Sequence, residues 1–229
     1  MSNASTTYRS ISTNSGNAVS RWLLELHAAM LRPLTTMVIL VLQLWGCSYD
    51  TAPLTGAPVG SVTDPIGDTF GSGGTRWDVT ALTITRSADS VVVQLDFATD
   101  VISPMSRDTN AVLGVVDFDV DQNASTGVVA AVDHFRPGTG STGIRADYQL
   151  LLTGFTADST VEVVDSLGIP TGRVKPIYSA KRITIQIPLA LLGNDDGLFD
   201  AAAMVGTHHR PSDIIPDNGH LTVTGTRNY

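Results

Sequence analysis

Apolar and polar residues alternate along most of the second half of the chain, which is the period of a half-buried β-strand. The pattern is clearest over 78–97, where two alternating runs flank the polar turn SADS. The second run puts its apolar side chains on one face: Val91, Val93, Leu95 and Phe97. The spacing therefore predicts an antiparallel hairpin over 78–97.

Further short β-like runs follow, separated by clusters of Gly, Pro, Asn and Asp. They cover 111–120, 128–135, 146–155, 160–165, 172–180, 182–188, 199–207 and 220–225. Only the segment near 189–193, directly after Pro188, has a helical pattern. About ten short strands joined by such turns are typical of sandwiches. We predict an all-β fold over 61–229, a single antiparallel β-sandwich of jelly-roll or Ig-like form with that one short helix.

The chain before residue 61 has a different character. An uncharged, mostly apolar run over 33–44 follows Arg32 and precedes Leu-Trp-Gly-Cys, which ends at Cys47. Twelve residues are too few to cross a bilayer, which needs about 20, but they match the apolar region of a signal peptide. We interpret 1–46 as a leader and 47–60 as the lipidated cysteine and a tether. A core helix with an incidental cysteine is the alternative.

Leu-Trp-Gly-Cys resembles the lipobox of bacterial lipoproteins, in which a small residue precedes the lipidated cysteine. Gly46 fits this pattern, whereas Trp45 departs from it. The resemblance implies lipidation at Cys47 and attachment to a membrane of the bacterial cell envelope, the outer membrane if the cell has two. Translation from Met1 or from Met30 is equally compatible with the sequence.

The net charge of the chain limits the classes of molecule that it can bind. The whole chain has a net charge of −8, and the part from Cys47 onward carries 11 basic and 21 acidic side chains, hence −10. Nucleic acid is excluded as a partner because binding to phosphates needs a basic face. The 20 Asp against 2 Glu favour turns and hard-cation sites over helices.

The stretch VVDFDVDQNASTG, residues 115–127, concentrates this acidity. Side chains at alternate positions of a straight strand stand about 6.6 Å apart, too far to share one ion, so the chain must curl after the strand. Asn123 and Gly127 favour such a turn. We predict a structural Ca²⁺ site here, with a solvated acidic turn as the alternative. The candidate ligands are Asp119, Asp121, Asn123 and Thr126, with Asp117 and Asp147 to complete the set.

Several short motifs occur together in order. They are DPIGD at 64–68, WDV at 77–79, the Asp-rich loop ending in Thr-Gly, ADY at 146–148, IPL at 187–189 and SDIIPD at 212–217. This succession, over roughly 61–225, resembles secreted bacterial β-sandwich domains of the DOMON-like group, which are related to type 9 carbohydrate-binding modules. The resemblance implies a binding module without a catalytic centre, with the Asp-rich loop as a calcium-binding element.

The resemblance also implies that aromatic rings of the module contact the bound ligand. Trp77, the one Trp after Cys47, and Tyr148 are the candidates, although Trp77 also suits a place in the sandwich core. The main hypothesis is a lipid-anchored, non-enzymatic binding module stabilised by calcium, with a glycan or another envelope protein as partner. The alternative is a carbohydrate-binding or accessory subunit of an envelope glycan hydrolase system.

No nucleophile or metalloprotease motif supports an enzyme. Two pairs of residues could in principle act in catalysis or bind a transition metal. Asp64 and Asp68 are interpreted as turn formers rather than an acid/base pair, and adjacent His208 and His209 would point to opposite faces of a strand.

Overall fold

The computed structural model describes most of the chain after residue 53. The described residues are 54–71, 74, 76–87, 89–138, 140–153, 159–208 and 210–227. The predicted leader, the predicted lipidation site Cys47 and His209 lie outside them. No helix among the described residues has the length and apolar character needed to cross a membrane.

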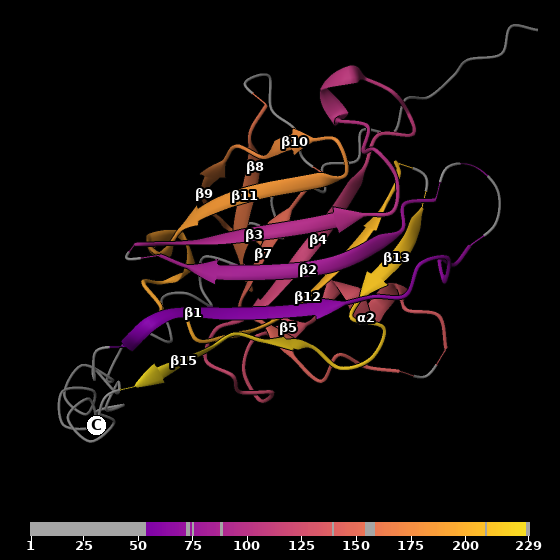
Figure 1. Ribbon diagram of the computed structural model, residues 1–229. Helices are drawn as coiled ribbons and strands as arrows, with labels where there is room; N and C mark the ends of the chain where they lie inside the picture. Colours follow the sequence, from indigo (N-terminus) through magenta and orange to yellow (C-terminus); the bar gives the residue numbers. More distant parts are fainter. Residues whose placement is uncertain are drawn as a thin grey trace, which may run out of the picture. The chain divides into compact units, whose positions relative to one another are not determined.

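One antiparallel sheet, sheet A, has six strands. Its first strand along the chain, β1, lies between β2 and the last strand, β15 (Figure 1). In spatial order the strands are β10 (Ile177–Ser179), β11 (Arg182–Pro188), β3 (Ser90–Phe97), β2 (Val79–Arg86), β1 (Leu54–Thr63) and β15 (Thr224–Arg227).

The second antiparallel sheet, sheet B, has seven strands. In spatial order they are β13 (Pro211–Ile215), β12 (Asp200–Gly206), β4 (Leu113–Asp119), β7 (Tyr148–Leu151), β8 (Val161–Asp165) and β9 (Pro170–Val174), with β14 (Leu221–Thr222) also paired to β12. The remaining elements are the small ladder of β5 (Val128–Val129) and β6 (Arg145–Ala146), the helix α2 (Ala131–Phe135), and two 3-10 turns, η1 (Pro104–Ser106) and η2 (Leu189–Leu192).

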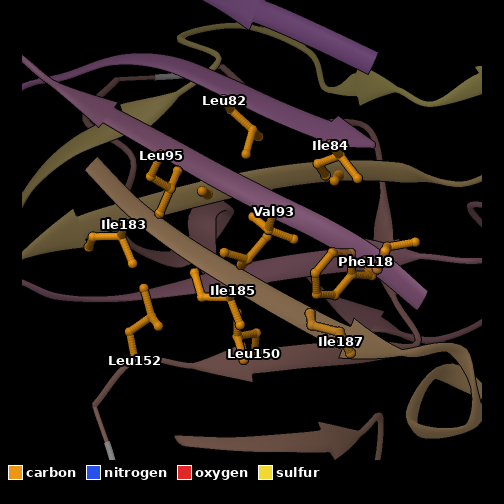
Figure 2. Packing of buried hydrophobic residues seen from close by; sticks show 14 of the residues in the cluster. Leu82, Ile84, Val93, Leu95, Phe118, Leu150, Leu152, Ile183, Ile185 and Ile187 are labelled. Carbon is orange, nitrogen blue, oxygen red and sulfur yellow. The ribbon is translucent and has the colours of Figure 1, made fainter. Parts of the chain in front are cut away.

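The main core lies between the two sheets, as Figure 2 shows. Alternate residues of each strand point into it, because successive side chains of a strand point to opposite faces. Val93 and Leu95 of β3 thus face Phe118 of β4 and Leu150 of β7 across the sandwich. The rings of Phe118 and Phe199 meet edge to face with centroids 5.5 Å apart, a favoured aromatic geometry.

Sheet B is also covered on part of its outer face. A second apolar cluster there joins Val115 of β4 and Met204 of β12 to Val132 of α2 and Ile144. As a result β4 is buried on both faces from Gly114 to Asp119. Its two outward-pointing carboxylates, Asp117 and Asp119, are therefore buried too.

The all-β antiparallel sandwich predicted from the sequence is confirmed. The hairpin over 78–97 forms as the antiparallel pair β2 and β3, with a shift of register between Val79 and Ala81. The helix predicted near 189–193 is a single 3-10 turn, Leu189–Leu192, closed by Gly193 in the left-handed conformation at φ 73°, which glycine adopts without cost.

Several local predictions differ from the structure. The predicted run 172–180 is divided between β9 of sheet B and β10 of sheet A, and the run 220–225 between β14 of sheet B and β15 of sheet A. The segment 128–135 is not one strand, because β5 stops at Val129 and the chain turns into α2, which places Ala130 and Val132 in the outer apolar cluster. β1 begins at Leu54, earlier than the predicted start of the sandwich at residue 61. Strand β13 was not expected, since the polar Ser212 and Asp213 hide its pattern, yet both are buried.

The sheet edges are short or begin with proline. Sheet B ends in β9 and β13, and their first residues are Pro170 and Pro211. Sheet A ends in the three-residue β10 and in β15. Proline lacks the N–H that a further strand would need, so it is tolerated at such positions.

Candidate metal centre

The chain curls directly after β4, as the predicted calcium loop required. Asp119 ends β4, Asp121 follows in the loop, and Asp147 lies between β6 and β7. Each places a carboxylate oxygen within 4.8 Å of the other two. We call Asp119, Asp121 and Asp147 the loop cluster.

Backbone N–H groups hold this curl in place. The amide of Asp147 donates to the Phe118 carbonyl at 2.8 Å, which brings Asp147 beside the end of β4. The amide of Asn123 donates to Oδ1 of Asp119 at 3.1 Å and to Oδ1 of Asp121 at 3.0 Å. The carboxylates are thus oriented by the loop that surrounds them, as in an Asx-type turn.

Two predicted ligands lie one step further out. The Thr126 hydroxyl donates to both carboxylate oxygens of Asp121, at 2.9 and 2.8 Å. The side-chain oxygen of Asn123 accepts from the Ser125 amide at 3.0 Å. In the structure these two side chains shape the loop, whereas the three carboxylates converge.

Asp117 is not part of the convergence. It points to the outer face of β4 but is fully buried beneath α2, where it accepts hydrogen bonds from the Val132 amide at 3.0 Å and from Nε2 of Gln149 at 2.6 Å. Burial raises its pKa. Its contacts connect α2 to sheet B, which is a structural role.

The loop cluster concentrates negative charge without a neutralising side chain. Burial, followed by the charges of Asp121 and Asp200, raises the pKa of Asp119, and burial with the charge of Asp121 raises the pKa of Asp147. Among the described residues, no Lys or Arg forms an ion pair with these carboxylates. Such an oxygen-only set is what hard cations such as Ca²⁺ bind.

Arg145 is the cationic side chain attached to this loop. Its guanidinium donates to the carbonyl oxygens of Thr126 at 3.1 Å and Gly127 at 3.1 Å. These bonds fasten the end of the loop to β6. The charge of Arg145 is thereby directed to backbone carbonyls rather than to the loop cluster.

The two aromatic candidates do not form an exposed platform. Trp77 is 2% exposed, packs edge to face on Phe97 at 6.1 Å between ring centroids, and donates from Nε1 to the Asn110 carbonyl. Tyr148 is half-buried and packs against the same core. Both rings therefore contribute to the fold in this structure.

A concave groove lies on the outer face of sheet B, beside α2. Its volume is about 540 Å³, within the range of small-molecule sites. Val115, Leu151 and Met204 line it, together with Phe135 and His208. Phe135 is 54% exposed, so the groove presents an apolar surface with polar groups at its rim.

The sequence prediction missed a second group of carboxylates. Asp64, Asp68 and Asp213 each place an oxygen within 4.8 Å of the others. Burial, with the charges of neighbouring aspartates, raises the pKa of Asp64 to about 7 and that of Asp213 to about 7. The available signal was the recurrence of Asp in the motifs at 64–68 and 212–217, but nothing in the sequence showed that these motifs meet.

No protein-family model and no curated protein matches this chain. The resemblance to DOMON-like and type 9 carbohydrate-binding domains, and to lipoproteins at Cys47, therefore stays a prediction. What the protein does must be inferred from its own residues.

Proposed function

We propose that this protein is a non-catalytic β-sandwich binding module of the bacterial cell envelope, attached through lipid on Cys47 and stabilised by Ca²⁺ in the loop cluster. One observation carries the calcium assignment. Three carboxylates from two separate segments converge within 4.8 Å, and none of them forms an ion pair with a Lys or Arg of the described residues. Like charges so close repel one another, and a bound cation reverses the sign of that interaction.

Calcium suits the loop cluster better than a smaller ion. It takes six to eight oxygens in flexible geometry, whereas Mg²⁺ demands a near-ideal octahedron. Asp119 ends a strand, Asp147 lies between two strands and Asp121 lies in a loop, so the ligand set combines rigid and adaptable positions. Water completes the coordination on the exposed side of Asp121.

The anchor rests on the sequence alone. The apolar run 33–44 and the Gly46-Cys47 step support processing before the cysteine. Acyl chains contribute about 0.8 kcal/mol per buried CH₂, so two or more chains hold a protein stably at a membrane. The groove on sheet B supports a binding role for the domain that this anchor carries.

Thermal unfolding with calcium and with chelator tests the loop cluster. Calcium at a hundred times its dissociation constant should stabilise the fold by about 2.7 kcal/mol per site. Asp121→Ala should remove one such increment, while Asp100→Ala, an exposed carboxylate in the turn after β3, should leave the response intact. An Asp121→Ala protein that responds to calcium like the unmodified chain would remove the loop cluster from the proposal.

Membrane fractionation tests the anchor. Cys47→Ser should move the protein out of the membrane fraction or leave the leader uncut, since no other residue can accept the lipid at that position. Unchanged mass and unchanged fractionation of Cys47→Ser would contradict lipidation.

A further inference from the structure

The second acidic group lies where the two sheets meet. Asp64 directly follows β1, Asp68 belongs to the connection from β1 to β2, and Asp213 belongs to β13 of sheet B. We call these three residues the sheet-bridging cluster. Figure 1 shows the end of β1, the start of β2 and β13 at one side of the sandwich.

Hydrogen bonds fasten the connection 64–78 onto β13. The Phe70 amide donates to the Ser212 carbonyl at 2.9 Å, and the Ser212 hydroxyl accepts from the Trp77 amide at 2.8 Å and donates to the Trp77 carbonyl at 3.0 Å. The neighbouring Asp213 accepts from the Val79 amide at 2.7 Å. These bonds join β13, which carries Asp213, to residues before and at the start of β2.

One carboxylate oxygen in this cluster lacks any partner. Asp64 is 8% exposed, and its Oδ2 is buried with no hydrogen bond. Oδ1 of the adjacent Asp78 is likewise buried and unpartnered, although its Oδ2 accepts from the Gly67 amide at 2.8 Å. Buried polar atoms in native proteins are almost always satisfied, and a bound ion is one of the recognised explanations for an exception.

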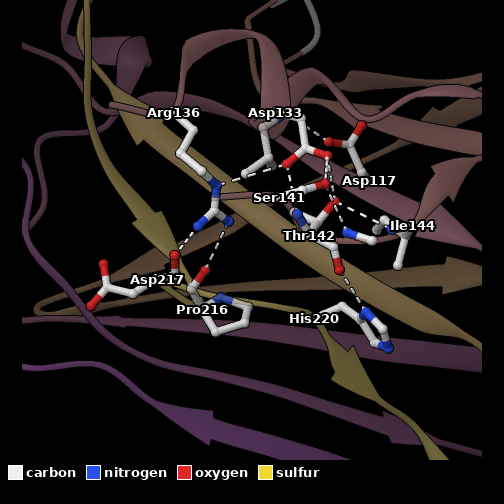
Figure 3. A network of polar contacts seen from close by, with 11 residues as sticks. Asp117, Asp133, Arg136, Ser141, Thr142, Ile144, Pro216, Asp217 and His220 are labelled. Atoms are coloured by element: carbon white, nitrogen blue, oxygen red, sulfur yellow. Dashed lines mark hydrogen bonds and ion pairs between the residues drawn. The ribbon is translucent and has the colours of Figure 1, made fainter. Parts of the chain in front are cut away.

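No positive side chain of the described residues pairs with the cluster. Arg136 is at the same end of the molecule, but it forms an ion pair with Asp133 at 3.7 Å and donates to the backbone carbonyls of Pro216 and Asp217. Figure 3 shows that the carboxylate of Asp217 points away from this guanidinium. Arg136 thus forms no ion pair with Asp64, Asp68 or Asp213, although its charge acts on the neighbouring Asp217.

A cavity adjoins the exposed member of the cluster. Its volume is about 250 Å³, and Asp68, Asp217 and Arg136 are among the residues that line it. Asp68 is exposed, whereas Asp64 and Asp213 are buried. An ion entering this way would bind carboxylates on one side and keep water ligands on the other.

The geometry points to a second cation site, in which Asp64, Asp68 and Asp213 bind one hard divalent cation that joins the end of β1 to β13. The donor set is all oxygen, which selects Ca²⁺, Mg²⁺ or Mn²⁺ over Zn²⁺ or Cu²⁺. Asp78 and Asp217 supply further negative charge beside it. This site shares no residue with the loop cluster, so it stands or falls independently of the proposed function.

Calorimetric titration of the metal-free full chain with CaCl₂ tests the site by counting ions. The unmodified chain should bind two calcium ions, Asp68→Ala one, Asp121→Ala one, and the double variant none. The exposed Asp100→Ala serves as the charge-matched control and should bind two. MnCl₂ is the second probe, because a site of this chemistry accepts either ion.

The outcomes separate the two assignments. Suppose that the unmodified chain binds one ion, that Asp68→Ala binds none and that Asp121→Ala still binds one. This outcome supports the sheet-bridging site and contradicts the loop cluster. An Asp68→Ala protein that binds calcium and manganese with the stoichiometry and affinity of the unmodified chain overturns the sheet-bridging site.

A second variant distinguishes ion binding from a merely structural carboxylate. Asp64→Asn keeps the size of the side chain and removes its negative charge. It should raise the melting temperature of the metal-free protein and at the same time abolish the rise that calcium produces through this site. Asp64→Asn that lowers the metal-free melting temperature and leaves the full calcium response would show that Asp64 serves the fold alone.

Discussion

The two acidic clusters present the same donor chemistry in opposite settings. The loop cluster takes two of its three carboxylates from positions two residues apart, and its Asp121 is exposed. The sheet-bridging cluster draws Asp64 and Asp213 from opposite ends of the domain and buries both. Each cluster has one exposed carboxylate, Asp121 or Asp68, whose charge water and salt screen. The loop cluster buries one of its three members and the sheet-bridging cluster buries two, so we expect the second to depend more strongly on a cation.

The largest expected effect is the joint loss of both clusters. Removing calcium from the unmodified chain should lower the free energy of unfolding by about 5 kcal/mol, the sum of two sites at a hundredfold excess of calcium. For a domain of this size that corresponds to roughly 10–20 °C in melting temperature. Differential scanning calorimetry of Asp68→Ala/Asp121→Ala should show no calcium response, and a retained response would break the pairing of the two clusters.

A smaller effect is expected from a change in the backbone beside the loop cluster alone. Gly127 has φ 68°, and a Cβ there would lie 2.7 Å from the Ala146 carbonyl oxygen. Gly127→Ala should therefore cost about 1–3 kcal/mol and weaken calcium binding at the loop cluster, because Ala146 adjoins Asp147. Gly138→Ala, at φ 86° with open space around its Cβ position, is the control for backbone strain alone. Equal calcium affinity in the two variants would contradict the proposed link between Gly127 and calcium binding at the loop cluster.

A further contrast is the pH dependence of the metal-free protein. Burial raises the pKa of Asp64 to about 7 and that of Asp213 to about 7, from an ordinary value of 3.8. Between these values the folded state binds more protons than the unfolded state, so the free energy of unfolding should rise as pH falls from about 7 to 4, by up to about 1.4 kcal/mol per pH unit for each of the two groups. This stability is present at low pH and lost as pH rises through about 7.

Chemical denaturation of the metal-free chain at several pH values measures this slope. Asp64→Asn should flatten it, whereas Asp121→Ala should leave it nearly unchanged. A metal-free chain whose stability falls steadily from pH 7 to pH 5 would contradict the burial argument.

Elements that depend on residues close together in the sequence could be predicted from it. Alternation predicted β2 and β3, and the spacing of Asp119 and Asp121 followed by Asn123 predicted the curl after β4. Asp117 was also a candidate ligand, because it shares the strand face of Asp119. The alternation of a strand cannot show that α2 covers this position. Asp147 was identified only as a candidate, and the β4–β7 pairing explains why it joins the loop cluster.

The sheet-bridging cluster was beyond the sequence for a physical reason. Its members meet only because β13 packs beside the start of β2, and β13 itself was missed because Ser212 and Asp213 interrupt its apolar pattern. The Ser212 side chain accepts the Trp77 amide and the Asp213 side chain accepts the Val79 amide, which satisfies polar atoms that a strand pattern would leave in water. A single sequence does not show such a long-range partnership.

The prolines that open β9 and β13 have a consequence for a crowded surface. Molecules held side by side on a membrane meet at a high effective concentration, and an open strand edge is a template for pairing with a neighbour, which leads to aggregation. Pro170 and Pro211 each remove a donor from an outer edge of sheet B. If the domain is anchored to a membrane as proposed, these prolines would disfavour pairing between neighbouring copies through the edges of sheet B.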